Sequence, residues 1–540
     1  MTVMHIAIPF PTDTIRMSFG KPEFTWGRDV ATHSFLSGLA EAGVSHRVTL
    51  WVPSRADAEL LENTVLAEIQ ANIHIISGIE ITRYLEEHPV DVMHVMDPNM
   101  WIGGHIRNLL TDRDFVITGM THSLGNQHFL DWSLLSNANG IESSDCLICT
   151  TPTAQVVINS MFSHLKAHQP DYSAPQTEVI PLGMDLTLFQ APTRLTRQDL
   201  GLPADDFVIL SLGRFNPISK MDVLPLLNLL SMLKQKSMHN VRLVLAGSEN
   251  DGQYVQFLRD RTRKIGLEDS VSFITSPTDE QKVALYQLAD VFLSLSDNLQ
   301  ETFGLTVIEA LACGLPVVVS DWDGYRALVE HEVTGFLVST KMLGPDPQWE
   351  ANLSLQPDSM AHILCAQTTA VDLPAACEAL LGLAGDREAL QRMSGAAAAS
   401  AAQYDWQQII PRYLALWEQL VERKAAAGIN ASERNRRTSA LRFLQDFSGY
   451  PSTQLLPDDQ FVTSEIGQLL LQGKATVHPY EETQEILDLQ LMAKILNTCL
   501  HKTSVQELLS IIQPAGTGQD ALRISQNLLW LYKYGYLSAQ

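Results

Sequence analysis

The chain has 540 residues, of which 45% are hydrophobic and 18% are charged, a composition typical of a globular protein with large buried cores. Its 61 acidic residues exceed the 37 basic residues and give a formal net charge of −24. This balance argues against broad nucleic-acid binding, because phosphate backbones favour clustered lysine and arginine. Since a domain usually holds about 100–200 residues, we expect about three domains.

The N-terminal sequence MTVMHIAIPFP has neither the basic start nor the long apolar core of a secretory signal. No apolar run reaches the roughly 18–20 residues that a membrane span needs. The six cysteines are too few for a disulfide scaffold, which favours a reducing compartment. We therefore expect a cytoplasmic protein without a membrane span, with peripheral attachment at the inner membrane left open.

The first half of the chain alternates short apolar runs with longer helical stretches. Strands are predicted over residues 5–10, 46–52, 91–96, 115–120 and 146–151. A helix is predicted over 29–43. This alternation predicts a parallel sheet covered by helices, and the continuous apolar character of the strands fits burial on both faces.

Cys146 and Cys149 form a CxxC in the last of these strands. We interpret them as core cysteines, because no second pair lies nearby to complete a zinc site.

The same pattern then starts again in the second half. Strands are predicted over 207–213, 241–247, 271–274, 291–296 and 316–320. Two such sheets in series predict an α/β fold with two Rossmann-like domains facing a cleft. Ligands are expected at the carboxyl ends of the strands.

The remaining segments differ in character from the two sheets. The Pro- and Asp-containing stretch 344–359 is predicted as an inserted loop, and a long helix is predicted over 405–428. In that helix Trp406 and Trp417 are interpreted as anchors into a core. The polar stretch 429–440 is predicted as a linker.

The last hundred residues are predicted as a separate, mostly helical module. An amphipathic helix is expected at 478–500, and the module ends in the aromatic stretch 524–538. The sequence leaves the role of this module open between a winged-helix-like unit and a unit for homo-oligomerisation. The expected domains are therefore 1–187, 188–428 with its terminal helix, and an accessory module at 441–540.

Residues 296–324 carry the strongest functional signal, with Glu301 and Glu309 separated by seven residues. A strand is expected to end near Ser296 and a helix to begin around Gly304, so free backbone N–H groups and the positive end of the helix dipole make an anion site. Gly304 lets a phosphate approach the backbone closely. Glu309 lies about one turn into the helix, where a carboxylate can accept hydrogen bonds from ribose hydroxyls. Glu301 lies before the helix, nearer the position of a sugar.

Two cations precede this segment. Arg214 follows a predicted strand and a glycine, and Lys220 comes six residues later, in LGRFNPISKMD. Arginine offers a bidentate fork and lysine a point charge, so together they can neutralise a pyrophosphate.

These motifs resemble those of the retaining GT-B glycosyltransferases of the family 4 type. ETFGLTVIE resembles the family's E-x7-E element, and the GR…K spacing resembles its diphosphate motif. VIPLGMD, VTGFLV and THS (121–123) are similar to its hinge, its closing strand and an N-domain segment, in the correct order. The likeness covers roughly residues 3–425 and implies a GT-B fold.

The resemblance implies a role for each matched position. Arg214 and Lys220 would bind the donor diphosphate, and Glu301 would contact the transferred sugar. The backbone of Phe303, Gly304, Leu305 and Thr306 would hold phosphate and sugar, and Glu309 would bind the ribose. His122 would lie in the cleft near the sugar, on the acceptor side. The loop 11–29 would line the acceptor pocket, although it departs from the family's tight "GG" turn.

The implied activity is transfer of a hexose-type sugar from a nucleotide-diphosphate sugar, UDP- or GDP-linked, with retention of anomeric configuration. The resemblance implies no metal and no cofactor beyond the donor. Asp321-Trp322-Asp323 matches a DxD pattern, but its place after a late strand favours a turn. The acceptor is left open between a glycan, a lipid carrier, a metabolite and a protein.

Three other classes of protein are alternatives to this hypothesis. A sugar-phosphate synthase or a phosphorylase would use the same fold, although a phosphorylase is disfavoured because the chain lacks a recognisable pyridoxal-phosphate lysine motif. A catalytically idle GT-B scaffold would bind partners only, and the intact acids and cations argue against it. A Rossmann dehydrogenase is excluded because IPFPTD, and no G-x-G-x-x-G, follows the first strand.

Overall fold

A computed structural model describes residues 3–10, 27–41, 46–63, 73–77, 81–109, 114–126, 128–249, 252–427, 443–480, 483, 486–512 and 518–540. Residues 11–26 of the predicted acceptor loop and the predicted linker 429–440 lie outside these ranges. The chain divides into two compact units. Met1–Trp51, Leu61–Ile75 and Arg83–Ser439 form the first unit, and Ala440–Gln540 with Val52–Leu60 and Ile76–Thr82 form the second.

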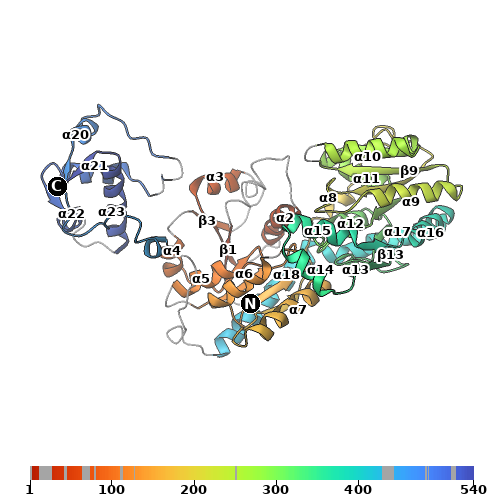
Figure 1. Cartoon of the computed structure of the whole chain (residues 1–540), viewed down its shortest axis with the longest axis horizontal. Coiled ribbons are helices and arrows are strands. Elements are labelled where there is room, and N and C mark those ends of the chain that lie inside the picture. The colour runs from red at the N-terminus through yellow and green to blue at the C-terminus, as the bar shows by residue number, and fades with distance from the viewer. Residues whose placement is uncertain are drawn as a thin grey trace. The chain divides into compact units, whose positions relative to one another are not determined.

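The first sheet has seven strands in the order β3-β2-β1-β4-β5-β6-β7 (Figure 1). Its strands are β1 (His5–Pro9), β2 (Arg47–Val52), β3 (Ile73–Ser77), β4 (Val92–Val95), β5 (Val116–Met120), β6 (Cys146–Cys149) and β7 (Gln176–Val179). Its helices are α2 (Gly27–Glu41), α3 (Arg55–Asn63), α4 (Ile81–Glu87), α5 (Trp101–Leu109), α6 (Phe129–Ala138) and α7 (Pro152–His168). Neighbouring strands pair in parallel along β2-β1-β4-β5-β6-β7. The five predicted strands are confirmed. The two that sequence patterns missed, β3 and β7, are the edge strands, and their residues are less buried than those of the central strands.

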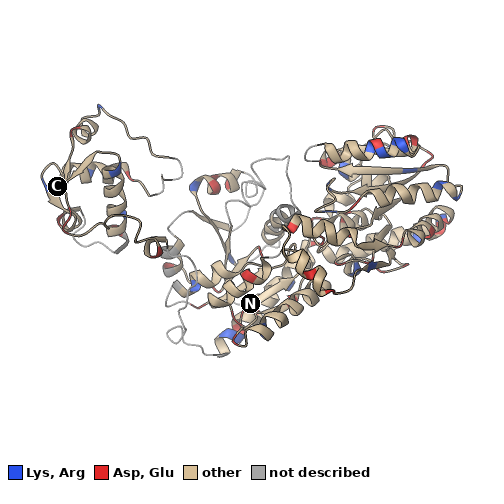
Figure 2. Cartoon of the chain, in the orientation of Figure 1, with Lys and Arg blue, Asp and Glu red and all other residues tan. Residues whose placement is uncertain are grey.

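The second sheet has six parallel strands in the order β10-β9-β8-β11-β12-β13. The strands are β8 (Phe207–Leu212), β9 (Val241–Gly247), β10 (Val271–Thr275), β11 (Val291–Ser294), β12 (Val317–Ser320) and β13 (Gly335–Val338). Helices surround it: α8 (Thr187–Gln190), α9 (Leu224–Gln235), α10 (Gln253–Lys264), α11 (Asp279–Leu288), α12 (Leu305–Ala312), α13 (Tyr325–Leu328), α16 (Leu373–Gly385) and α17 (Arg387–Ala401). Leucines of α9, including Leu226 and Leu230, pack with Leu243 and Leu293 of the strands in one buried core. Figure 2 shows basic and acidic residues mixed along the outer helix α10. The predicted pair of Rossmann-like domains is confirmed.

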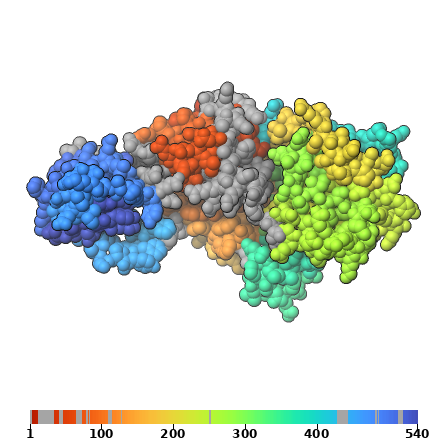
Figure 3. All heavy atoms as spheres, turned by 90° about the horizontal axis from the view of Figure 1, so that it is seen from above, coloured from red at the N-terminus to blue at the C-terminus, as the bar shows by residue number. Residues whose placement is uncertain are grey.

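The predicted inserted loop at 344–359 is wrong, because this segment forms a helical hairpin. It consists of α14 (Pro347–Ser354) and α15 (Asp358–Gln367), joined at its base by the antiparallel strands β14 (Thr340–Met342) and β15 (Thr369–Val371). The Asp346 side chain accepts from the backbone N–H groups of Gln348 and Trp349, and Pro347 occupies the first helical position. The proline and aspartate that suggested a loop are therefore the start signals of a helix. Figure 3 shows this hairpin, in blue-green, projecting from the surface.

The long helix α18 (Trp406–Ala427) is the last described helix of the first unit and packs on the first sheet. The Trp417 Nε1–H donates to Thr118 Oγ1 of β5 at 3.1 Å, and the Trp406 Nε1–H donates to Ser34 Oγ of α2 at 2.5 Å. Both indoles are buried, which confirms that they anchor a core. Glycine is required beside them, because a Cβ at Gly38 or Gly183 would lie within 2.4 Å of the Trp406 ring.

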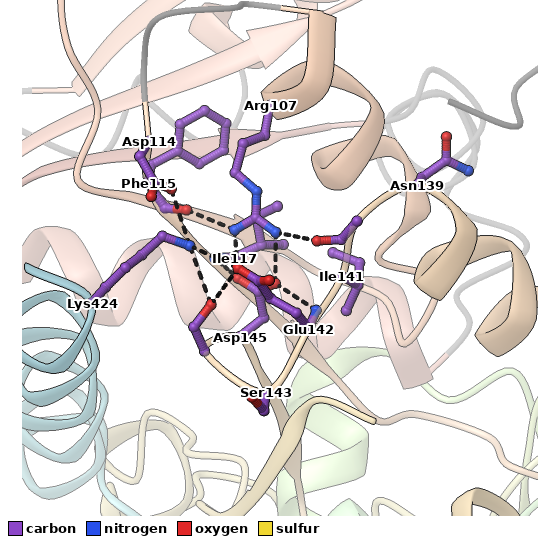
Figure 4. A network of polar contacts seen from close by, with 12 residues as sticks. Arg107, Asp114, Phe115, Ile117, Asn139, Ile141, Glu142, Ser143, Asp145 and Lys424 are labelled. Carbon is purple, nitrogen blue, oxygen red and sulfur yellow. Dashed lines mark hydrogen bonds and ion pairs between the residues drawn. The ribbon is translucent and has the colours of Figure 1, made fainter. Parts of the chain in front are cut away.

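A buried ion pair holds the amino ends of β5 and β6 together (Figure 4). The Arg107 guanidinium donates to both oxygens of Asp145 at 2.7 Å, and also to the carbonyls of Phe115 and Gly140. Asp145 further accepts from the backbone N–H of Ile117 at 2.9 Å. Burial alone would raise the pKa of Asp145, but the adjacent Arg107 lowers it below its ordinary value. This pair lies at the end of the sheet opposite the carboxyl edge.

The second unit includes a small antiparallel sheet in the order β17-β16-β18, formed by β16 (Gln460–Thr463), β17 (Thr503–Ser504) and β18 (Leu537–Ala539). Its helices are α19 (Phe443–Asp446), α20 (Glu465–Leu471), α21 (Leu489–Thr498), α22 (Val505–Ile512) and α23 (Gly518–Lys533). The core contains Phe461, Ile495, Leu528 and Leu531. The mostly helical character is confirmed, but the predicted helix at 478–500 is present only as α21. The aromatic ending 524–538 is divided between α23 and β18. Among the described helices, none is long and apolar enough to cross a membrane.

Candidate functional site

Three loops meet at the carboxyl edge of the second sheet. They follow β8, β11 and β12 and cover residues 213–222, 295–304 and 321–324. Parallel strands bring their carboxyl ends to one edge, so residues far apart in sequence meet there. This is the edge where the sequence predicted the donor site.

Lys220 and Glu301 form an ion pair at this edge, with side chains 13% and 10% exposed. The Tyr325 hydroxyl donates to the same Glu301 oxygen at 3.2 Å and lies 2.8 Å from Ser294 Oγ. Burial alone would lower the pKa of Lys220, but the Glu301 carboxylate raises it above its ordinary value, so the ammonium stays charged. The pKa of Arg214 is lowered by burial, an effect that Glu301 opposes. The structure therefore brings Arg214, Lys220 and Glu301 into one electrostatic cluster.

Asn298 ties the loop of Glu301 to the loop of Lys220. Its side-chain amide donates to the Ile218 carbonyl at 2.6 Å, and its Oδ1 accepts from the Gln300 backbone N–H at 2.9 Å. Its own carbonyl accepts from the Trp322 Nε1–H at 3.1 Å. Asn298 is fully buried. It therefore fixes all three loops relative to one another, a role that no sequence motif indicated.

The start of α12 lies beside this cluster, as predicted for Gly304. Gly304 caps the helix with φ +107°, a conformation that favours glycine, and a Cβ there would lie 2.6 Å from the Tyr325 ring. The hydroxyls of Thr302 and Thr306 are buried and have no hydrogen-bond partner among the described residues. Leu305 begins the helix, and the ring of Phe303 is buried against Tyr404. Two unpaired hydroxyls therefore lie at the helix end where an anion was expected.

Glu309 is held by a separate set of partners. The Tyr286 hydroxyl donates to its Oε2 at 2.7 Å, and Lys282 pairs with its Oε1. The Lys282 ammonium also lies 5.6 Å from the centre of the Phe189 ring, within range of a cation–π interaction. Glu309 itself is buried. It lies on the helix that Gly304 begins.

His122 follows β5 in the first domain, and its Nε2–H donates to the Met96 carbonyl at 3.0 Å. The next residue, Ser123, donates to Gln300, which directly precedes Glu301. The loops of His122 and Glu301 therefore touch across the two sheet domains.

Two acids near the site have raised pKa values. Burial, with a contribution from Asp222, raises the pKa of Asp297 to about 7. Burial, with a contribution from Glu301, raises the pKa of Asp323 to about 7. Asp323 adopts φ +40° in a turn, and Arg326 binds Asp321, so the turn predicted for the DxD pattern is confirmed. Among the described residues no group of three or more His, Cys, Asp or Glu could hold a metal ion.

Cys146 and Cys149 are fully buried in β6 with reduced thiols. Burial raises the pKa of Cys149 to about 12, so the thiol stays protonated. Their interpretation as core cysteines is confirmed.

Residues 193–343 match the sequence model of the family described as Glycosyl transferases group 1. The match lies in the second sheet domain. The matched region includes Arg214, Lys220, Glu301 and Glu309. This confirms the family 4 type resemblance at the level of the family.

Two curated relatives with the same description each match this chain over part of their own length. D-inositol 3-phosphate glycosyltransferase of Thermobispora bispora is 34% identical over 203 residues, which are 36% of this chain and 46% of the relative. The enzyme of the same description from Salinispora arenicola is 32% identical over 211 residues, 36% of this chain and 45% of the relative. The chain therefore spans about half the length of the curated relatives it matches.

Solved structures confirm the GT-B fold. Sucrose-phosphate synthase from Thermosynechococcus elongatus aligns with a TM-score of 0.52 and 20% identity, over 78% of this chain and 100% of that chain. Anabaena HepE in complex with UDP aligns with a TM-score of 0.51 and 18% identity, over the same shares.

Proposed function

We propose that the chain transfers a hexose-type sugar from a nucleotide-diphosphate sugar to an acceptor, with retention of anomeric configuration. The observation that carries the proposal is the contact between Lys220 and Glu301 beside the Gly304 start of α12. A cation, an acid and a helix N-terminus at one sheet edge offer a charge partner for a diphosphate and a hydrogen-bond acceptor for a sugar.

The Lys220 ammonium has three donor hydrogens, so it can bind a phosphate oxygen while it retains Glu301. The buried hydroxyls of Thr302 and Thr306 would add two donors to the phosphates or the sugar. Each carboxylate oxygen can accept two hydrogen bonds, so Glu309 keeps acceptor capacity for ribose hydroxyls beside Tyr286 and Lys282.

In the proposed reaction the acceptor hydroxyl attacks the anomeric carbon from the face that the diphosphate leaves. The bond between that carbon and the diphosphate oxygen breaks, and the same phosphate oxygen takes the proton of the acceptor. No protein base is needed, so the contribution of the chain is electrostatic. Arg214 and Lys220 stabilise the negative charge that develops on the leaving group.

Donor binding is the first test. A thermal-shift panel of UDP-, GDP- and ADP-sugars should show stabilisation by one nucleotide class, since a ligand at 100 times its dissociation constant stabilises by roughly 2.7 kcal/mol. UDP-sugars are the first arm, because the fold neighbour HepE is described in complex with UDP and with UDP and glucose. If no nucleotide diphosphate stabilises the chain, the proposal fails.

Turnover is the second test, followed as release of the nucleotide with the stabilising donor. Lys220→Ala or Arg214→Ala should lower turnover about 10²-fold or more, the loss expected when one preorganised charge is removed. Lys236→Ala is the matched control, because Lys236 pairs with Glu378 on the exposed surface. Near-normal turnover of both site variants would contradict the proposal, and binding without turnover in the unmodified chain would favour an idle scaffold. The anomeric configuration of the product, read by NMR, tests retention.

A further inference from the structure

A closed chain of hydrogen bonds joins the α14–α15 hairpin to both sheet domains. Ser123 of the first domain donates to Gln300 Oε1 of the second. The Gln300 Nε2 lies 2.8 Å from Nδ1 of His362, which is buried on α15. His362 Nε2 in turn contacts the Gly125 carbonyl, two residues after Ser123. The chain of bonds thus leaves the loop 121–126 and returns to it.

The chemistry of the partners fixes the direction of each bond. The Gly125 carbonyl can only accept, so His362 Nε2 carries the hydrogen. His362 Nδ1 is then an acceptor, which matches a donating Gln300 amide. Gln300 Oε1 accepts from the Ser123 hydroxyl. These three links then each have a matched donor and acceptor. The longer contact of 3.3 Å between Gln300 Nε2 and His362 Nε2 joins two donors and is not a hydrogen bond.

Gly125 provides the space for this contact. A Cβ at residue 125 would lie 2.9 Å from His362 Nε2 and 3.2 Å from both Cβ and O of Leu299. A side chain there would force the loop away from the hairpin and from the loop of Glu301. The absence of a side chain at Gly125 therefore allows the close approach of the two domains.

The chain of bonds lies directly beside the candidate site. Ser123 follows His122, and Gln300 precedes Glu301. Asn298 already fixes the Glu301 loop within the second domain. The bonds made by Gln300 and His362 add a connection to the first domain. The family match ends at residue 343, so the hairpin lies outside the matched region.

We propose that His362, carried on the α14–α15 hairpin, is a positioning residue that holds the His122 loop against the Glu301 loop. It acts through Gln300 and the Gly125 carbonyl and need not touch the substrate. Its effect on sugar transfer rests on the proposed function, whereas its effect on the arrangement of the two domains does not.

The arrangement of the domains is measured without reference to activity. Spin labels on Lys166→Cys of α7 and Lys264→Cys of α10, both exposed, report the distance between the domains by pulsed electron paramagnetic resonance in a Cys313→Ser background. His362→Ala and Gly125→Ala should broaden this distance distribution and shift it to longer values. Met360→Ala, an exposed change on the same helix, is the control and should leave it unchanged.

Kinetics separate positioning from a merely structural role. His362→Ala should lower kcat about 3- to 10-fold, which corresponds to the loss of one hydrogen bond. Nucleotide affinity should stay within about twofold, because Lys220 and Glu309 are untouched. His362→Gln, whose amide can both donate and accept, should recover part of the loss if the variant keeps these bonds.

The outcomes distinguish the two proposals. A changed distance distribution in a chain that turns over no nucleotide sugar supports the proposed role of His362 in holding the two domains together. The same result refutes the proposed function. An unchanged distance distribution for both His362→Ala and Gly125→Ala refutes the proposed role of His362 in holding the two domains together, whatever the activity. A changed distribution with unchanged kcat overturns the positioning role.

Discussion

Gly304→Ala tests whether the backbone at the start of α12 is as constrained as the structure indicates. A left-handed φ costs a non-glycine residue about 1–2 kcal/mol. At Gly304 the new Cβ would also meet the Tyr325 ring at 2.6 Å, and overpacking of a buried ring adds about 1–3 kcal/mol. Tyr325 is fully buried and bonded to Ser294 and Glu301, so its ring cannot move without disturbing the site.

Gly201→Ala is the matched control, because Gly201 has φ +67° in the same domain and a Cβ there would meet nothing within 4 Å. Both variants should lose stability because alanine is strained at a left-handed φ. Only Gly304→Ala should lose further stability, because its Cβ meets the Tyr325 ring. The extra loss of about 1–3 kcal/mol corresponds to a melting temperature roughly 2–12 °C lower for a domain of this size. Calorimetry of the two variants measures the difference directly. Equal melting temperatures would refute the assigned contact between residue 304 and Tyr325.

Three further changes test the charges of the first unit. Asp145→Ala leaves the Arg107 guanidinium buried without its partner and should lower the free energy of unfolding at pH 7 by about 3–5 kcal/mol in urea titrations, and an unchanged midpoint would contradict the ion pair. Because the folded pKa of Asp145 is lowered, its contribution is complete above the unfolded pKa near 3.9 and is lost as the pH falls through the folded value. The contribution of Asp297 to stability depends on pH in the opposite direction. Burial and Asp222 raise its pKa to about 7, so the protonated carboxyl stabilises the fold below pH 4. That stability is lost as the pH rises to 7. Asp297→Asn should therefore gain stability relative to the unmodified chain between pH 5 and pH 8, and parallel pH profiles would show that this carboxyl titrates normally. Under the proposed function, Glu309→Gln should weaken nucleotide binding about 10-fold or more, and calorimetric titration showing unchanged affinity would remove Glu309 from the ribose site.

The sequence predicted the fold well wherever a strand is buried on both sides. Central strands such as β5 and β8 are continuous apolar runs, which mark them without any tertiary information. The edge strand β7 has the sequence QTEV, and its residues are only partly buried. An edge strand contacts fewer neighbours, so its sequence carries less of the pattern by which strands are recognised.

The hairpin was missed for a different reason. Its first helix has no buried residue, so it lacks the apolar stripe by which a helix is recognised. Asp346 and Pro347 were counted as loop residues, although the same pair is favoured at a helix start. Local signals of this kind are ambiguous until the tertiary partners of the helix are known.

The residues of the candidate site also differ in how far they could be predicted from the sequence. Arg214, Lys220, Glu301 and Glu309 lie in short motifs, so the sequence and the family resemblance could single them out as candidates. Asn298, Tyr325 and His362 act through contacts with segments distant in sequence, such as Asn298 with Ile218 and His362 with Gly125. Sequence distance hides such partners, and only the meeting of strand ends at one edge shows them.

The cations of this edge are already paired in the free chain, and this shapes how it can bind an anion. Lys220 contacts Glu301 and Lys282 contacts Glu309, so the site carries opposite charges in fixed positions within a chain of net charge −24. Pairing holds each ammonium in place beside its carboxylate, which lowers the reorganisation required when a ligand arrives. It also means that Glu301 or Glu309, if neutralised, would leave a partly buried lysine without its charged partner. Each acid at this edge therefore has two physical roles, one in holding a lysine and one in accepting hydrogen bonds from a ligand, and Glu→Gln variants will disturb both.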